Sequence, residues 1–157
     1  MAAEAVKEFF VRRGLADRIR EFDVSSATVE LAARALGVEP YRIAKSLSFL
    51  VNGHAVLIVV AGDARVDNAK YKARFGSKAK MLTPEETKTL VGHSVGGVCP
   101  FVLNDGVQVY LDESLRRGES VFPACGTGSS VIELTIGELE KYSGFAGWVD
   151  VCKNWRD

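Results

Sequence analysis

Apolar and polar residues recur along this chain with two periods, one typical of helices and one typical of strands. Near the start, Val6, Phe9 and Phe10 follow a helical spacing that ends at Gly14, because glycine readily adopts the left-handed backbone that closes a helix. Residues 25–28 supply capping side chains for a second helix, which ends at Gly37. Helices are predicted over residues 2–13, 29–36, 67–75, 83–92 and 135–142, with a short helical turn after Pro40.

The strand signal is strongest over residues 45–51 and 54–61. These two runs flank Asn52-Gly53, the dipeptide that best tolerates the positive φ angles of a tight hairpin. The run 55–61, AVLIVVA, is apolar on both faces, which predicts a central strand covered on each side. Shorter strands are predicted over residues 22–24, 78–82, 101–103, 107–111, 120–124, 130–134 and 146–151. Together, these elements predict one mixed α/β domain over residues 1–157.

Composition narrows the class of protein. The 157 residues are 47% hydrophobic, and twenty basic side chains balance twenty acidic ones, so there is no global positive field to gather long nucleic acids. The longest apolar run is far shorter than the roughly 20 residues that span a bilayer. We therefore expect a cytoplasmic protein that has neither a membrane nor DNA as a partner.

The cysteines give no sign of a disulfide framework or a metal site. Cys99, Cys125 and Cys152 are odd in number and widely separated, with no CxxC spacing. We expect no metal and no cofactor. Cys99 and His93 are six residues apart in one loop and suggest a thiol nucleophile with its base, but no carboxylate is placed to orient the histidine.

Lys45 stands where a helical turn enters an apolar strand, and Ser46 follows it. Under one interpretation Lys45 marks the wet entrance of the strand, with its stem packed and its ammonium in water. Under the other, a compact cation beside buried strands holds a phosphate or a polarised carbonyl. Its position alone leaves both interpretations open.

Two loops of small residues are further candidates. In residues 93–100, Gly96 and Gly97 allow close backbone approach and Pro100 stiffens the exit, so the loop can present amide N–H groups to a carbonyl oxygen or oxyanion. Residues 124–130 (ACGTGSS) can form the floor of a pocket. The alternatives are a plain connecting loop for the first and a β-turn for the second.

A family resemblance joins these features. Three segments resemble, in order and spacing, the YbaK/prolyl-tRNA-synthetase editing superfamily: 28–30 (TVE) with 32–33 (AA) and 36–38 (LGV), 43–47 (IAKSL), and 96–100 (GGVCP). The later segment 126–134 (GTGSSVIEL) continues the match. The resemblance implies a partly closed mixed β-sheet flanked by helices, with a pocket for the aminoacylated 3′ end of a tRNA. It also implies hydrolysis of mischarged aminoacyl esters in trans, on proline tRNA or a related tRNA, with a synthetase as the candidate protein partner.

The resemblance also assigns roles to residues. The family lysine matches Lys45, and the family GxxxP loop matches residues 96–100. Lysine would hold the phosphate or carbonyl side of the substrate, loop amides would hold the ester, and the ribose 2′ hydroxyl or a water would complete proton transfer. The candidates are Lys45, Gly96, Gly97, Val98 and Cys99 for catalysis, and Ser46, Pro100, Gly128, Ser129, Ser130 and Val131 for substrate binding.

One position departs from the family pattern. The cysteinyl-tRNA-deacylating members of the family have a segment similar to Gly-Leu-Asp-Ile-Glu-Leu, where this chain has Ser-Ser-Val-Ile-Glu-Leu. Val131 therefore stands where those members carry aspartate. A few wall changes redirect preference among small amino acids, because one methylene is worth only about 1–3 kcal/mol. Alanine, serine, threonine and cysteine esters are therefore all candidate substrates. A non-catalytic module that binds a tRNA end or a nucleotide is the alternative function.

A basic segment completes the candidates. Its members are Arg65, Lys70, Lys72, Arg74, Lys78 and Lys80. It is either a local tRNA-binding patch or a solvated basic helix.

Overall fold

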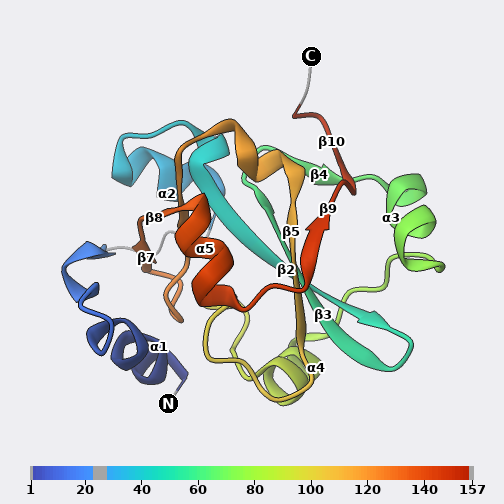
Figure 1. Ribbon diagram of the computed structural model, residues 1–157, viewed down its shortest axis with the longest axis horizontal. Helices are drawn as coiled ribbons and strands as arrows, with labels where there is room; N and C mark the ends of the chain where they lie inside the picture. Colours follow the sequence, from blue (N-terminus) through green and yellow to red (C-terminus); the bar gives the residue numbers. More distant parts are fainter. Residues whose placement is uncertain (1, 23–27, 156–157) are drawn as a thin grey trace.

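A computed structural model describes residues 2–22 and 28–155, and its centre is a six-stranded curled mixed sheet (Figure 1). The strand order is β8-β6-β2-β3-β5-β9. The pairs β2–β3 and β6–β8 are antiparallel, whereas β2–β6, β3–β5 and β5–β9 are parallel. The strands are β2 (Ile43–Val51), β3 (His54–Ala61), β5 (Gln108–Asp112), β6 (Ser120–Pro123), β8 (Leu134–Thr135) and β9 (Gly147–Val149). The predicted mixed α/β fold with a sheet flanked by helices is confirmed.

Helices cover the sheet and its ends. In Figure 1, α1 and α3 lie toward opposite ends of the molecule, and α5 crosses in front of the sheet. Their bounds are α1 (Ala2–Val11), α2 (Val29–Leu36), α3 (Asn68–Phe75), α4 (Pro84–Glu86), which continues into the π-helical turn η3 (Thr87–Val91), and α5 (Ile136–Ser143). The shorter 3-10 turns are η1 (Ala16–Arg18), η2 (Pro40–Arg42) and η4 (Glu113–Arg117). No helix among the described residues is both long and apolar enough to span a membrane.

Local signals explain why these helices begin and end where they do. Thr28 caps α2 by accepting from the Leu31 amide, and Gly37 closes it in the left-handed conformation. Thr83 and Thr135 each form a capping box at the start of α4 and α5. Of the predicted capping segment 25–28, residues 25–27 lie outside the described residues.

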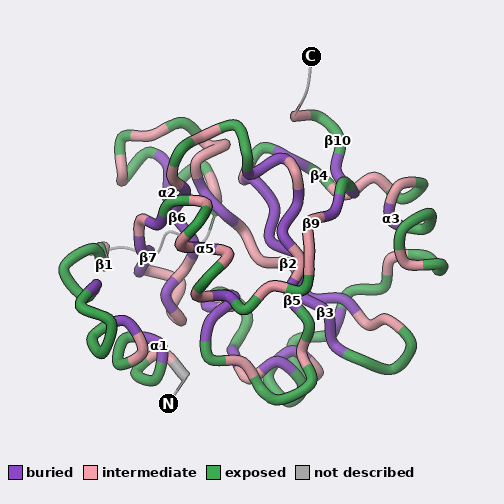
Figure 2. Tube along the Cα trace, in the orientation of Figure 1, coloured by how far each residue is buried: buried purple, intermediate pink, exposed green. Residues whose placement is uncertain are grey.

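The hairpin β2–β3 is the scaffold of the core. Asn52 and Gly53 adopt φ angles of 51° and 81°, as the sequence predicts. Every residue of β3 except His54 is buried, and Figure 2 colours this strand as part of a continuous buried centre. Burial on both faces follows from the uninterrupted apolar run, since each side chain packs against a covering layer.

Two small sheets flank the central one. β1 (Ile19–Glu21) pairs antiparallel with β7 (Ser130–Ile132), and β4 (Arg65–Val66) pairs antiparallel with β10 (Cys152–Lys153). The strand predicted over 130–134 is therefore divided between β7 and β8. The strand predicted over 22–24 is displaced: β1 ends at Glu21, residue 22 is irregular, and residues 23–24 lie outside the described residues.

Two predicted strands are wrong. Residues 78–82 make only an isolated bridge between Met81 and Phe49, and residues 101–103 form no strand. Phe101 is fully buried but packs its ring on Phe10, so its apolar character reflects core packing and not pairing in a sheet. Short apolar runs carry the same signal in both situations.

One edge of β2 is open along part of its length. Pairing with β6 ends at Ala44↔Pro123, and contact with the 80–82 segment begins at Ser48, whose carbonyl accepts from the Leu82 amide. Leu50 donates to the Lys80 carbonyl on the same edge. Residues 45–47 therefore face a gap between two neighbours, and the candidate site lies beside this gap.

Candidate functional site

A cavity of about 420 Å³ lies beside the open edge of β2. Its walls come from α2, β2, the start of α4, the loop at 95–98 and the segment 122–131. The apolar side includes Val29, Ala32, Ile43, Phe122 and Val131. Within the described part of the chain, Lys45 is the only charged residue that lines it. We call it the first cavity.

Alternation along β2 divides its side chains between two cavities. Successive strand residues point to opposite faces, so Ser46 and Ser48 line the first cavity. Leu47 and Phe49 line a second cavity of about 760 Å³, and Lys45 borders both. Lys45 shares the face of Leu47 and Phe49, which places its stem with the second cavity.

The ammonium group of Lys45 is half-buried. Its Nζ donates to the Gly62 carbonyl at 3.4 Å. Burial lowers the pKa of Lys45 below its ordinary value, with Arg65 adding a smaller repulsive effect, while Asp63 and Glu30 act in the opposite direction. A cation that gives up part of its hydration and has one weak internal partner is prepared to bind an anion or a polarised carbonyl.

Ser46 presents three polar groups at the gap. Along a strand in an antiparallel pair, the backbone groups of successive residues point alternately toward the partner strand and away from it. Ser48 and Leu50 direct their backbone groups away from β3, so Ser46, two residues before Ser48, does the same. Its N–H and C=O therefore point to the open edge. The Ser46 hydroxyl is also buried without a hydrogen-bond partner among the described residues. Buried polar groups are normally satisfied, so this position is suited to a polar ligand.

The loop at 96–98 supplies backbone donors. Gly96 has a φ of 98°, which favours glycine, and both Gly96 and Val98 line the first cavity. Their amides donate no hydrogen bond to any described residue. The Gly97 amide donates to the Ser94 carbonyl at 3.0 Å, so it stabilises the turn and is not directed at a ligand.

Gly97 joins this loop to the second small-residue loop. A Cβ at Gly97 would lie 2.3 Å from the Gly126 carbonyl oxygen, so only glycine allows the two backbones this close approach. Gly128, Ser130 and Val131 from the second loop line the first cavity. The Ser130 and Thr127 hydroxyls lie 2.7 Å apart and form a hydrogen bond that links the start of β7 to the turn before it.

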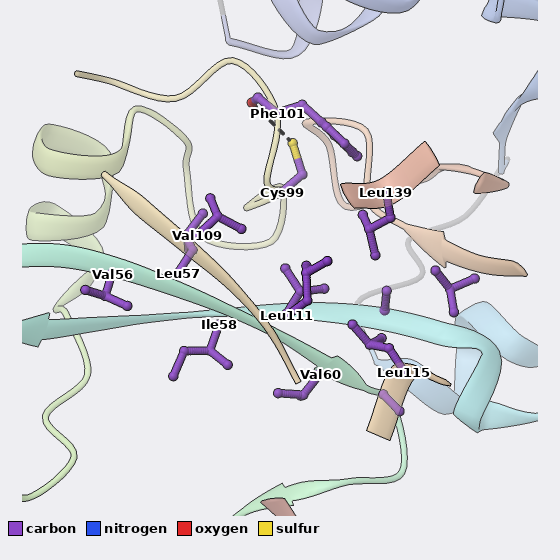
Figure 3. Close-up of a cluster of buried hydrophobic side chains, with 14 of the residues drawn as sticks. Val56, Leu57, Ile58, Val60, Cys99, Phe101, Val109, Leu111, Leu115 and Leu139 are labelled. Carbon is purple, nitrogen blue, oxygen red and sulfur yellow. Dashed lines mark hydrogen bonds between the residues drawn. The ribbon is translucent and has the colours of Figure 1, made fainter. Parts of the chain in front are cut away.

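Cys99 and His93 meet, but inside the core. Cys99 is 0% exposed and His93 is 1% exposed, and Figure 3 shows the thiol enclosed by core side chains with its hydrogen bond to the Phe101 carbonyl. Burial raises the pKa of the Cys99 thiol to about 12. A buried neutral thiol lacks both the charge and the access that a nucleophile requires.

The histidine geometry leads to the same conclusion. His93 Nε2 lies 2.8 Å from the Phe101 carbonyl oxygen and 3.6 Å from Cys99 Sγ. A carbonyl oxygen only accepts, so Nε2 carries the hydrogen and has no lone pair for the thiol proton. Its Nδ1 is buried and has no partner among the described residues. The pair is arranged as a structural contact.

The predicted site residues divide into two groups. Seven of them line the first cavity, namely Lys45, Ser46, Gly96, Val98, Gly128, Ser130 and Val131. Gly97, Cys99, Pro100 and Ser129 do not line it; Pro100 instead borders a separate cavity beside Phe9 and Arg13. Ser129 accepts from the Phe22 amide through its carbonyl, so it contributes to pairing near β1. The catalytic and binding roles assigned to all eleven stay predictions.

Several lining residues escaped the sequence prediction. Ser48 and Thr87 are buried, and their hydroxyls lie 3.2 Å apart at the cavity wall. Ser48 was accessible to sequence reasoning, because it lies two residues after Ser46 and strand alternation places it on the same face. Thr87 and Met81 carry no such local signal, since their positions depend on how 80–91 folds back on β2.

Comparisons with known proteins give matches to a family model and to single proteins. Residues 24–142 match the family model described as the aminoacyl-tRNA editing domain. The chain is 50% identical over 156 residues to "Uncharacterized protein YwhH" of Bacillus subtilis (strain 168), covering 99% of both chains. It is 34% identical over 90 residues to a proline–tRNA ligase of Geobacillus sp. (strain WCH70), a match that covers 57% of this chain and 16% of that ligase.

A solved structure extends the likeness to the whole fold. The crystal structure of a protein provisionally assigned as a trans-editing enzyme for prolyl tRNA synthetase superimposes with a TM-score of 0.86 at 33% identity. The superposition covers 97% of each chain. The fold is therefore shared over nearly the whole of both chains.

Proposed function

This chain belongs to the aminoacyl-tRNA editing domain family, and from that premise we propose that it is a trans-editing hydrolase. Its substrates would be mischarged tRNAs, proline tRNA or a related tRNA, that carry a small amino acid such as cysteine, alanine, serine or threonine. The observation that carries the proposal is the first cavity, with Lys45 as the one charged lining residue in the described part of the chain. Gly96 and Val98, whose amides donate to no described residue, line the same cavity.

The proposed reaction needs no protein nucleophile. An aminoacyl ester is more reactive than an amide, so positioning and stabilisation of the oxyanion suffice. Water attacks the ester carbonyl carbon, and the amides of Gly96 and Val98 hold the oxygen as negative charge develops. The bond between that carbon and the ribose oxygen then breaks. The ribose oxygen receives the proton, relayed by the neighbouring 2′ hydroxyl or a water.

Lys45 holds the substrate in this mechanism. Its ammonium reaches the junction between the two cavities, where a phosphate or the carbonyl side of the ester would lie. As a compact point charge it binds without fixing a bidentate geometry. Ser46, whose backbone N–H and C=O face the open edge and whose hydroxyl is buried beside the first cavity, supplies the neighbouring hydrogen bonds. Gly97 and Cys99 act on the site through the shape of the loop and make no substrate contact.

The cavity walls favour an uncharged small side chain. Val131 is 5% exposed and packs with Ala32, Ala33, Ile43 and Phe122 in an apolar cluster beside the cavity. The serine and threonine residues that also line the cavity offer hydroxyls to a polar side chain of similar size. A cationic side chain would lose hydration here, and no carboxylate among the described lining residues would replace it.

The alternative is a binding module that uses this cavity for a tRNA end or a nucleotide without turnover. A deacylation assay separates the two proposals. Purified protein is mixed with tRNAs charged with alanine, serine, cysteine or threonine, and release of the amino acid is followed against buffer. Hydrolysis of at least one supports the enzyme; tight binding of all four with no release above buffer supports the binding module.

A further inference from the structure

A tight turn after β3 carries the carbonyl group that accepts from Lys45. Residues 61–64 form a β-turn, closed by a hydrogen bond of 3.0 Å from the last amide to the first carbonyl. Gly62 and Asp63 occupy its two central positions. The Gly62 carbonyl, which belongs to the central peptide of the turn, accepts from Lys45 Nζ at 3.4 Å. The orientation of one peptide plane therefore decides whether Lys45 keeps this partner.

Both central residues restrict the orientation of that peptide plane. A Cβ at Gly62 would lie 2.4 Å from the Pro40 carbonyl oxygen and 2.5 Å from Val29 Cγ1, so η2 and α2 enclose this corner. The φ of Asp63 is not positive, which excludes a type II turn, in which the central peptide is reversed. The turn is therefore held in the form that directs the Gly62 carbonyl to Lys45.

Arg117 fastens the second corner of the turn through Asp63. Its Nη1 donates to Asp63 Oδ2 at 2.9 Å, and its Nη2 donates to Oδ1 through a shorter contact. Its Nε donates to the Ser114 carbonyl at 3.2 Å, and Nη1 also donates to the Trp155 carbonyl at 3.2 Å. A planar guanidinium that meets a carboxylate through two hydrogen bonds fixes its position as well as its charge. The turn is thereby joined to η4 and to the chain at residue 155.

The element that carries Arg117 is itself anchored in the core. The carboxylate of Asp112 is buried and accepts from the Ser114 and Val151 amides, each at 2.9 Å. The buried Ser114 hydroxyl accepts from the Ala61 amide at 3.0 Å, so η4 also bonds to the first residue of the turn. Support of this kind keeps a functional group in one geometry, because its neighbours are themselves fixed.

The charges around Lys45 give Asp63 a second role. Burial lowers the pKa of Lys45, and the titratable and charged groups that modify this effect come from β10, β4, the 61–64 turn and α2: Cys152, Arg65, Asp63 and Glu30. Arg65 adds to the lowering, whereas Asp63 opposes it, because a nearby carboxylate favours the ammonium form. One carboxylate therefore supports both the position of Lys45 and its positive charge.

Resting on the proposed function, we propose that Arg117 and Asp63 are positioning residues for Lys45. Their ion pair holds the 61–64 turn so that the Gly62 carbonyl keeps the ammonium at the junction of the two cavities. Neither Arg117 nor Asp63 lines the first cavity, where the ester would lie. The pair acts through Lys45, so its contribution to the reaction disappears when Lys45 is absent.

A double-mutant cycle tests this dependence on Lys45. Deacylation is measured in single turnovers with excess protein, so that slow variants can be followed. Arg117→Lys keeps the charge but loses the planar guanidinium, and it should slow deacylation about 10-fold to 10²-fold, as expected when a group of the site is displaced by about 1 Å. In the Lys45→Ala background, the same change should slow deacylation by less than about twofold.

Two control variants separate this coupling from general damage. Arg18→Lys alters another arginine–carboxylate pair, in which Arg18 Nη1 donates to the two oxygens of Glu138 at 2.7 and 2.8 Å, and it should leave deacylation unchanged. Lys88→Ala removes an exposed lysine that lines neither cavity, and is the control for Lys45→Ala. An Arg117→Lys effect of the same size with and without Lys45 would overturn the proposal.

A titration of Lys45 tests the same pair without any turnover. In protein labelled with carbon-13 at lysine Cε, the Lys45 signal is the one that Lys45→Met lacks. Asp63→Asn should lower the pKa of Lys45 below its wild-type value, because a neutral amide no longer favours the ammonium. Glu138→Gln neutralises the control pair and should leave the pKa of Lys45 unchanged. No shift in Asp63→Asn, or an equal shift in both variants, would overturn the proposal.

The two measurements distinguish a failure of this proposal from a failure of the proposed function. Wild-type protein that releases no amino acid from any of the charged tRNAs would remove the function, and the titration would still decide whether Asp63 supports Lys45. Deacylation without coupling between Arg117 and Lys45 would remove the positioning pair and leave the function standing.

Discussion

Two regions of this protein bring together residue types that are common in active sites, and only one of these regions is open to a ligand. Lys45, Gly96 and Val98 line a cavity of about 420 Å³. Cys99 Sγ and His93 Nε2 lie 3.6 Å apart, yet both residues are sealed in the core.

The difference shows that access and charge state decide more than proximity. Burial affects both regions, but in opposite ways. It lowers the pKa of Lys45 while leaving its ammonium at a cavity, and it raises the pKa of Cys99 so that the thiol stays protonated. Only the first change leaves a group that a substrate can reach.

Replacing Lys45 by alanine should produce the largest loss of activity. The change removes the charged group at the first cavity, and loss of one such electrostatic contact typically costs about 10²–10³-fold in kcat. The free energy of unfolding should change by less than about 1 kcal/mol, because a half-buried cation contributes little to the fold. Deacylation rates and urea unfolding measure the two effects. A Lys45→Ala protein as active as the Lys88→Ala control would remove Lys45 from the mechanism.

Gly97→Ala should lower both activity and stability, because it displaces the loop that lines the first cavity. The new Cβ would lie 2.3 Å from the Gly126 carbonyl oxygen and 2.6 Å from its carbon, so backbone has to move. Crowding of this kind costs about 1–3 kcal/mol and should displace the loop that carries the Gly96 and Val98 amides. Thermal unfolding and kcat report both losses. Gly137→Ala is the control: α5 leaves open space there, and the change should raise stability by about 0.5–1 kcal/mol.

The pH dependence of the free energy of unfolding should show that the pKa of Lys45 is lowered in the folded protein. Its folded-state pKa is lowered from 10.5, so between that lowered pKa and 10.5 the unfolded chain binds more protons. Stability therefore rises with pH across this window as the buried ammonium loses its proton. Lys45→Met lacks this contribution. Urea midpoints at neutral pH and near pH 10 should show wild-type protein gaining relative to Lys45→Met, and parallel changes in the two proteins would contradict it.

Cys99→Ala tests the sealed region. The variant should keep kcat within about twofold, because the thiol contacts no substrate, while losing about 1–2 kcal/mol of stability from the removed buried atom. Iodoacetamide should leave the activity of folded wild-type protein unchanged. Complete loss of activity in a folded Cys99→Ala protein would reverse the comparison between the two regions.

Sequence reasoning succeeded where the signal is local. Asn52-Gly53 predicted the hairpin, and Thr28 with Gly37 predicted the ends of α2, because turn angles and caps depend on a few neighbouring residues. Residues 78–82 and 101–103 were mistaken for strands, because an apolar residue that packs on the core looks the same in sequence as one that pairs.

The candidate site shows the same division. Lys45 and Gly96 were found because their residue types and a family resemblance point to them. The gap beside Ser46 could not be found, since it exists only because β6 stops pairing at Ala44 and the 80–82 segment begins at Ser48. The burial of Cys99 likewise depends on Phe10 and Phe101, which are brought together by the fold.

Ser46 and Ser48 provide the finest test, because they lie two residues apart on the same face of β2 and their hydroxyls differ in hydrogen bonding. The Ser46 hydroxyl has no partner among the described residues, whereas the Ser48 hydroxyl lies 3.2 Å from that of Thr87. Ser46→Ala removes a buried group that folding leaves unsatisfied, so stability should hold or rise by up to about 1 kcal/mol. Ser48→Ala leaves Thr87 unpaired and should cost about 1–2 kcal/mol.

Activity should respond in the reverse order if the Ser46 hydroxyl serves the substrate. Ser46→Ala should raise KM about threefold to tenfold, the effect of losing a hydrogen bond of about 1 kcal/mol, with little change in kcat. Ser48→Ala should leave KM unchanged in the fraction that is folded. Urea unfolding and steady-state deacylation of the two variants measure all four values. Equal stability losses in both would mean that Ser46 has an internal partner, and that the open edge of β2 is not the place where the ester binds.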